Sequence, residues 1–172
     1  MRIITMLMCC ILSCSVLAET IKINSKNASL QFSGEHAGRA FTGKFNEWQA
    51  TLMLPPETEP RIEAQFSLAS AETGNAMYDE TLVEDDWFNV KNTPTAKFVT
   101  SDIAKTDSGY MVKGELSLRG ISHLVTFALT RNQTGLSAEF DIDRLAFGIG
   151  KESDPDAEWV SREIGLRLTI PN

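Results

Sequence analysis

Apolar and polar residues alternate along most of the chain. Alternation with a period of two indicates β-strands that bury one face and expose the other. The pattern is clearest over residues 62–68, 110–118, 136–142 and 164–170. Shorter stretches of the same kind lie at residues 30–32, 41–45, 52–54, 98–103 and 125–129. The chain is therefore predicted to be all-β.

Turn-forming residues separate these stretches. Pro55-Pro56 and Arg119-Gly120 interrupt the pattern, and residues 107–109 and 132–135 are short, polar segments that end in glycine. The last two are short enough to connect hairpins. No internal repeat or linker divides the chain, so the pattern predicts one domain.

One segment departs from the alternation. Between Met77 and Leu82 the apolar residues are spaced by three and four, and Asn75 is suited to cap a helix start. We predict one or two helical turns between Asn75 and Trp87, followed by a loop over residues 91–94. A helix this short cannot cover a sheet. The apolar strand faces must therefore bury one another, in a two-sheet sandwich or a closed barrel.

The nine phenylalanines bear on what fills that interior. Most lie on the apolar phase of a predicted strand. A barrel of about eight strands has an interior just wide enough for side chains or for one slim ligand. Periodicity alone favours a solid core over a ligand cavity, and it does not decide between a sandwich and a barrel.

The first 18 residues have the features of an export signal. Arg2 gives a positive start, residues 3–12 are a nearly unbroken apolar run, and residues 16–18 fit a signal peptidase site. Cleavage after Ala18 would remove all three cysteines and leave a domain over residues 19–172. A buried N-terminal helix is the alternative interpretation. Lipid attachment at Cys14 is another, because residues 11–14 loosely resemble a lipoprotein cleavage site.

The charge balance narrows the class of partner. Acidic residues outnumber basic ones 23 to 16, which gives a net charge of −7. A protein that binds nucleic acid needs a surplus of Lys and Arg against the phosphate backbone, so nucleic acid is not expected as a partner. After the N-terminal segment no apolar run approaches the roughly 18 residues that a membrane-spanning helix needs.

Catalytic and metal-binding patterns are not found. His36 and His123 lie on unrelated segments, and the sequence lacks zinc-protease, nucleophile-elbow and phosphate-loop motifs. The acidic residues at 84–86 and 154–158 do not have the spacing of a calcium loop. We therefore predict neither an enzyme nor a metal or cofactor site.

Arg144 follows the predicted strand at 136–142 and is assigned a structural role. Its guanidinium is suited to a bidentate contact with a carboxylate, which Lys could not make. Asp79 or Glu163 is the expected partner, in an ion pair that ties the helical insertion to the sheet.

Ordered blocks along the chain resemble the YceI-like family of bacterial periplasmic, polyisoprenoid-binding proteins. The resemblance covers about residues 21–170. Its blocks are residues 28–36 with 43–45, residues 69–75 with 79–82, 87–90 and 94–98, residues 114–122 with 125–126, residues 144–150, and residues 160–164.

This sequence departs from the family's pattern at four positions. The family often has His at the position of Thr81, Phe at Trp87, Pro at Leu124 and an acidic residue at Arg162. The first two flank the expected cavity mouth, which bears on ligand identity more than on fold. Residues 150–159 are similar to family members associated with cytochrome b561-type membrane proteins.

The resemblance implies a lipocalin-like extended antiparallel β-barrel of about eight strands with one short helical insertion. It also implies a periplasmic, non-enzymatic carrier that holds a polyprenyl chain or an isoprenoid quinone in an apolar tunnel, which reverses the preference for a solid core. The expected ligand-binding residues are Phe32, His36, Phe45, Phe66, Trp87, Phe88, Phe98, Phe127, Phe140 and Phe147, with Trp87 and Phe88 as a lid and His36 near the mouth.

A second hypothesis gives the barrel a different role. The protein would be an accessory subunit that docks onto a cytochrome b561-type membrane redox protein and uses the barrel as a scaffold. A homodimer is a further candidate assembly. A lipid hydrolase or isomerase is the weakest hypothesis, because no nucleophile–base pair is found.

Overall fold

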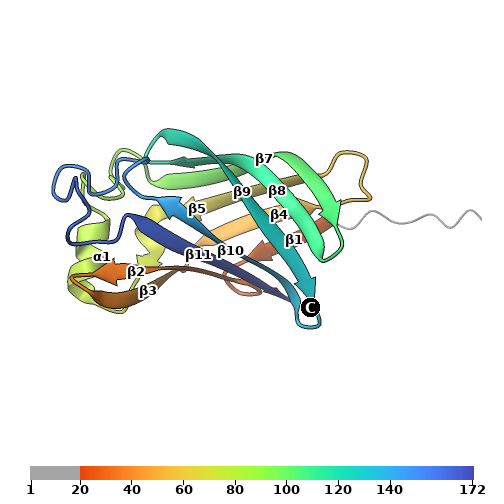
Figure 1. The fold of residues 1–172 in the computed structure, drawn as a ribbon, viewed down its shortest axis with the longest axis horizontal. Coiled ribbons are helices and arrows are strands. Elements are labelled where there is room, and N and C mark those ends of the chain that lie inside the picture. Colours follow the sequence, from red (N-terminus) through yellow and green to blue (C-terminus); the bar gives the residue numbers. More distant parts are fainter. Residues whose placement is uncertain (1–19) are drawn as a thin grey trace, which may run out of the picture.

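The computed structural model describes residues 20–172. Eleven strands form one antiparallel sheet (Figure 1). They are β1 (Thr20–Asn24), β2 (Ser29–His36), β3 (Arg39–Phe45), β4 (Trp48–Met53), β5 (Arg61–Ser67), β6 (Ala71–Glu72), β7 (Thr95–Thr106), β8 (Gly109–Leu118), β9 (Ile121–Asn132), β10 (Gly135–Asp143) and β11 (Glu163–Pro171). The expected signal peptide, residues 1–18 with Cys14, lies outside the described residues.

The sheet curls around an apolar interior. Its strands are hydrogen-bonded in the order β1-β4-β5-β7-β8-β9-β10-β11-β2-β3-β6. The hydrogen-bonded ladder therefore ends at β1 on one side and at β6 on the other. The chain itself brings the two ends together, because β3 and β4 lie near opposite ends of the ladder and only Asn46 and Glu47 connect them.

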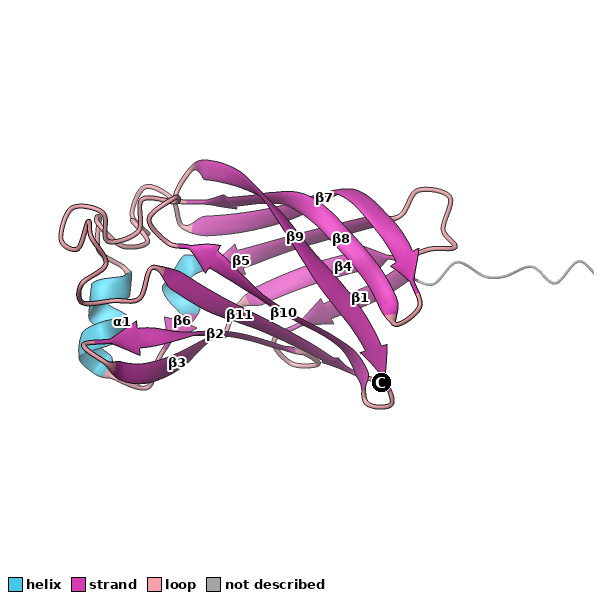
Figure 2. Cartoon of the chain, viewed as in Figure 1, coloured by secondary structure: helices cyan, strands magenta, loops and turns pink. Residues whose placement is uncertain are grey.

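The predicted helix is present. Helix α1 (Ala76–Leu82) begins after Asn75, whose side-chain oxygen accepts hydrogen bonds from the backbone N–H groups of Met77 and Tyr78. A single 3-10 turn, η1 (Leu68–Ser70), precedes β6. Figure 2 shows α1 and the long loops gathered at one end of the barrel. We call α1 and residues 83–94 the cap.

The hairpins form where turn residues predicted them. Two-residue turns join β7 to β8 and β9 to β10. Strands β9 and β10 stay together only briefly, since their pairing covers Gly135–Ser137 against Thr130–Asn132. Beyond that point they diverge toward the cap end (Figure 1). The rings of Phe127 and Phe140 stack between them, with centroids 4.5 Å apart and planes 9° apart.

The all-β fold class is confirmed, with eleven strands in place of about eight. Two strands, β1 and β6, were not predicted from the alternation because they are too short to show it. β1 offers only Ile21 and Ile23 to the apolar phase, and β6 has two residues, too few to show a period. The expected closure is also incomplete, since within residues 20–172 no ladder joins β1 to β6.

Candidate functional site

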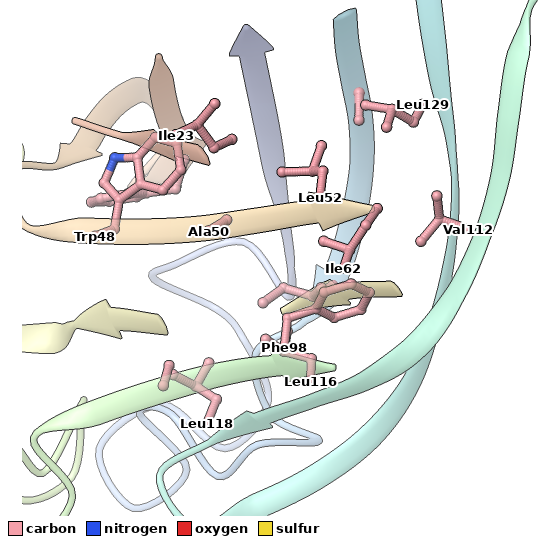
Figure 3. Close-up of a cluster of buried hydrophobic side chains, with 14 of the residues drawn as sticks. Ile23, Trp48, Ala50, Leu52, Ile62, Phe98, Val112, Leu116, Leu118 and Leu129 are labelled. Atoms are coloured by element: carbon pink, nitrogen blue, oxygen red, sulfur yellow. The ribbon is translucent and has the colours of Figure 1, made fainter. Parts of the chain in front are cut away.

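An apolar cavity of about 160 Å³ lies inside the barrel. Every strand except β6 contributes inward-facing side chains to its wall, and the cap adds Leu82, Trp87 and Phe88. Figure 3 shows part of this wall, with side chains of β4 and β7 pointing into the interior. The interior is thus hollow but narrow. It is neither the solid core favoured by periodicity nor the open tunnel implied by the family resemblance.

Aromatic rings form much of the wall, in two clusters. In the first, Phe45 lies 5.3 Å from Phe32, 6.2 Å from Phe66 and 6.3 Å from Phe88 between ring centroids. In the second, Phe127 lies between Phe98 at 5.6 Å and Phe140 at 4.5 Å. Packed rings of this kind present a large apolar surface with few rotatable bonds.

Two glycines allow rings to lie flat against the sheet. Gly43 pairs with Phe32 across β2 and β3, and a Cβ at this position would collide with the Phe32 ring. Gly114 on β8 pairs with Thr100 of β7, and a Cβ added there would lie 2.6 Å from the Cζ atom of Phe98. The missing side chains of these two glycines therefore leave the space that the rings of Phe32 and Phe98 occupy.

Few polar side chains line the cavity. Among the described residues that line the cavity, none has a carboxylate, imidazole, hydroxyl or thiol, and the side-chain nitrogens belong to Trp48, Trp87 and Arg144. No group of three or more His, Cys, Asp and Glu side chains in residues 20–172 is placed to hold a metal ion. The arrangement offers an apolar binding surface and no acid–base pair.

Arg144 is buried and fully engaged with protein. Its guanidinium donates to Asp154 Oδ2 at 2.6 Å and to the backbone carbonyls of Ile149, Val160 and Ser161. The guanidinium also lies over the Trp87 ring, with its Cζ atom 5.7 Å from the ring centroid. Arg144 therefore holds the loop over residues 144–162 in place at the cavity wall.

The expected partners of Arg144 were wrong. Asp79 instead accepts hydrogen bonds from the backbone N–H and hydroxyl of Thr73, and Glu163 is exposed at the start of β11. Asp154 takes the pairing role because the chain after β10 loops back, which brings position 154 beside 144. A charge pattern does not reveal such a return of an irregular loop.

Burial disfavours the charged form of Asp154, but its hydrogen bonds outweigh this effect. Backbone N–H groups of Val160, Trp159 and Glu158 donate to the carboxylate, and Arg144 lies beside it. Together they hold the pKa of Asp154 below its ordinary value. The Arg144–Asp154 pair is therefore charged at neutral pH.

The same loop is fastened to the cap. The Asp86 carboxylate accepts from the backbone N–H groups of Glu152 and Ser153 and from the Ser153 hydroxyl. Arg119, at the turn after β8, donates to the backbone carbonyls of Asp85 and Gly148. The end of the barrel beside α1 is thus covered by a hydrogen-bonded structure.

Eight of the ten predicted ligand-binding residues line the cavity. His36 and Phe147 do not. His36 Nδ1 lies 3.0 Å from the Tyr78 hydroxyl and links β2 to α1. Phe147 lies beyond the end of β10 and packs against His123, with ring centroids 5.0 Å apart. Alternation could not place Phe147, because alternation has no meaning outside a strand.

Sequence reasoning also missed part of the wall. Trp48, Phe41 and Leu68 line the cavity and were not proposed. The signal for Trp48 was present, since Trp48, Ala50 and Leu52 occupy alternate positions of β4.

Comparisons with known proteins agree with this architecture. The family model for the YceI-like domain matches residues 21–171. A UPF0312 protein of Shewanella denitrificans is 32% identical over 110 residues, which cover 62% of this chain and 58% of that protein. A UPF0312 protein of Yersinia enterocolitica is 26% identical over 91% of this chain and 87% of its own length. The chain therefore spans about three fifths of the first relative and most of the second.

Solved structures share the fold. The crystal structure of Burkholderia cenocepacia BcnA superposes with a TM-score of 0.78 at 25% identity, over 85% of this chain and 96% of that one. A structure described as a polyisoprenoid-binding domain from Saccharophagus degradans has a TM-score of 0.62 at 13% identity, over 90% of this chain and all of the other. Since the family model spans nearly all of the described residues, the chain belongs to the YceI-like family.

Proposed function

We propose that this protein is a non-enzymatic, periplasmic carrier that binds a long apolar isoprenoid-type ligand in the barrel cavity. The observation that carries the proposal is the cavity itself, walled by aromatic and aliphatic side chains from ten strands and the cap. The description of the Saccharophagus domain as polyisoprenoid-binding supports the choice of ligand class.

The energetics of such binding are favourable. Removing about 400 Å² of ligand surface from water is worth roughly 10 kcal/mol at about 25 cal/mol per Å². Loss of translational freedom and ordering of the ligand reduce this by several kcal/mol. The remainder corresponds to binding in the micromolar to nanomolar range.

The cavity size sets a condition on the ligand. An engineered apolar cavity of about 150 Å³ takes up benzene, and the cavity here has a similar volume of about 160 Å³. A longer prenyl chain therefore requires wall rings to rotate. Phe45, Phe66 and Phe127 are only half-buried and are the rings we expect to move.

Lipid extraction tests this function. Protein exported by a bacterial host is purified and extracted with organic solvent, and mass spectrometry should find about one isoprenoid per chain. Ala50→Phe should abolish this lipid, because Ala50 and Ala64 face each other on β4 and β5 and leave the space that a ring would fill. Ala128→Phe on the exposed face of β9 is the matched control. Folded wild-type protein that carries no lipid and takes up none would contradict the proposal.

The intact mass of the exported protein tests the predicted leader in the same preparation. Cleavage after Ala18 should give a chain that starts at Glu19. A lipid-modified chain that starts at Cys14 would contradict this and favour the lipoprotein alternative.

Docking onto a cytochrome b561-type membrane protein stays a second prediction. One observation favours it: Trp159, in the segment that resembles family members of that kind, is 61% exposed. None of the helices found in residues 20–172 is long and apolar enough to span a bilayer.

A further inference from the structure

The indole N–H of Trp48 is buried without a hydrogen-bond partner. Trp48 begins β4, is 6% exposed and lines the cavity. Within the described residues, its Nε1 is one of two side-chain polar atoms that are buried and unpaired; the other is Arg119 Nε, outside the cavity. Buried donors are nearly always paired, so an unpaired one calls for an explanation.

The neighbouring aromatic ring does not satisfy this donor. Phe66 is the cross-strand partner of Trp48, with ring centroids 6.4 Å apart and planes only 31° apart. The N–H lies in the plane of the indole, so in a nearly parallel pair it does not point at the face of the other ring. The Phe66 π-system is therefore a poor acceptor for this N–H.

A water molecule is also a poor partner. Buried waters make two to four hydrogen bonds to polar groups. Figure 3 shows Trp48 on the same side of β4 as Ala50 and Leu52, among apolar side chains of the wall. Here a water would find the indole N–H and no second polar side chain of the wall within the described residues, because Arg144 is committed to Asp154 and three carbonyls.

The position of Trp48 distinguishes it from the other lining groups with N–H bonds. Trp87 belongs to the cap and is only half-buried, and its indole nitrogen is not one of the buried, unpaired atoms of residues 20–172. Among the described residues that line the cavity, Trp48 is thus the one with a buried side-chain N–H that has no partner.

We propose that the Trp48 N–H donates a hydrogen bond to an acceptor oxygen of the ligand. The inference rests on the proposed function and narrows it. The ligand is an isoprenoid whose oxygen-bearing end, a quinone carbonyl or an alcohol, is enclosed inside the barrel, and an all-hydrocarbon isoprenoid lacks the group that the site recognises.

Paired probes test the inference. Delipidated wild type and Trp48→Phe are titrated by calorimetry with a menaquinone that carries a tetraprenyl side chain, with geranylgeraniol, and with squalene as the hydrocarbon. Trp48→Phe keeps an aromatic ring and removes the donor. We expect it to weaken binding of an oxygen-bearing probe about fivefold, the effect of losing one neutral hydrogen bond, and to leave squalene affinity unchanged. Whichever oxygenated probe loses affinity identifies the source of the acceptor.

The outcomes separate this inference from the function on which it rests. Equal loss for all probes, or no loss for any, overturns the role of Trp48 and leaves the carrier function standing. A wild type that binds none of the probes overturns both. Trp159→Phe on the exposed loop is the matched control and should change no affinity.

A second measurement serves if Trp48→Phe does not fold. In protein labelled with ¹⁵N-tryptophan, the indole resonance of Trp48 is assigned by elimination with Trp87→Phe and Trp159→Phe. A donor that gains an acceptor shifts its indole proton downfield. We expect that shift with an oxygenated probe and not with squalene; the same response to both would overturn the inference.

Discussion

Arg144 and Asp154 form an ion pair inside the protein, with Nη2 and Oδ2 2.6 Å apart and both side chains at most 5% exposed. Breaking a buried pair leaves an uncompensated charge. We therefore expect Asp154→Ala to lower the free energy of unfolding by about 3–5 kcal/mol. Urea unfolding followed by circular dichroism measures this effect.

An exposed pair provides the control. Arg167 and Glu139 pair across β10 and β11 with more than half of each side chain in solvent. Exposed pairs contribute about 0–1 kcal/mol, so Glu139→Gln should fall in that range. A similar cost for Asp154→Ala and Glu139→Gln would show that the Arg144 network does not stabilise the fold.

Acidic pH should destabilise the protein through three carboxylates of this end of the barrel. Burial opposes ionisation of Asp86, Asp143 and Asp154, but hydrogen bonds from Ser153, Arg162 and backbone N–H groups prevail, and each pKa is lowered in the folded state. A lowered folded pKa gives stability that is present above the unfolded value of about 4 and is lost as pH falls through the folded value.

The midpoint of urea unfolding, measured from pH 7 to pH 3, tests this pH dependence. It should fall below about pH 4, where the unfolded carboxylates take up protons. Asp86→Asn should make the fall shallower, because one of the three linked groups no longer titrates. A midpoint that is constant over the acid range would be inconsistent with the lowered pKa values.

A methyl group at Gly43 should act on the cavity wall. The added Cβ collides with the Phe32 ring, which must then move toward the cavity. Overpacking of this kind costs about 1–3 kcal/mol, so Gly43→Ala should lower unfolding free energy by that amount and also reduce lipid content. Thr42→Ala, at the exposed neighbouring position, should change stability by less than about 0.5 kcal/mol. Unchanged stability and lipid content in Gly43→Ala would mean that the ring position is unimportant.

The place where β9 and β10 separate should govern ligand exchange. Phe127 and Phe140 stack in this gap and are only half-buried. Phe127→Leu shortens the side chain at the gap, so bound lipid should transfer to acceptor vesicles several-fold faster than from wild type. Met111→Leu, on the outer face of β8, is a suitable control. If the two variants release lipid at the same rate as wild type, the route lies elsewhere.

The docking hypothesis predicts that substitutions on the exposed loop, and not those inside the barrel, affect partner binding. If the exposed loop around Trp159 binds a cytochrome b561-type protein, Trp159→Ala should abolish affinity capture of that protein. Ala50→Phe should leave it intact, since Ala50 lies inside the barrel. Capture that survives Trp159→Ala would place the contact on another surface.

Alternation identified the elements of this fold that are long and half-buried. It worked for β5, β8, β10 and β11, where every second side chain faces the interior. It also placed six phenylalanines on the wall, because a strand's inward phase in a barrel is its apolar phase, whereas Trp87 and Phe88 of the cap came from the family resemblance.

The sequence could not reveal what depends on irregular segments. The pairing of Arg144 with Asp154, and the attachment of the loop to Asp86, arise from a return of the chain after β10 that no period encodes. Nor could composition distinguish a narrow cavity from a solid core, since both are lined by the same residue types and differ only in how completely the rings fill the space.

The gap between the end strands β1 and β6, beside Asn46 and Glu47, has a mechanical consequence. In a barrel whose ladder is continuous, strand number and stagger fix the circumference. Here two short connections complete the circuit, Asn46 and Glu47 between β3 and β4 and η1 between β5 and β6, and within residues 20–172 no ladder joins β1 to β6. A change in the circumference of the barrel would therefore strain the few hydrogen bonds at this edge, from Asn46 N–H to the Ser70 carbonyl and from Ser67 N–H to the Glu47 carbonyl, and leave the strand ladders intact.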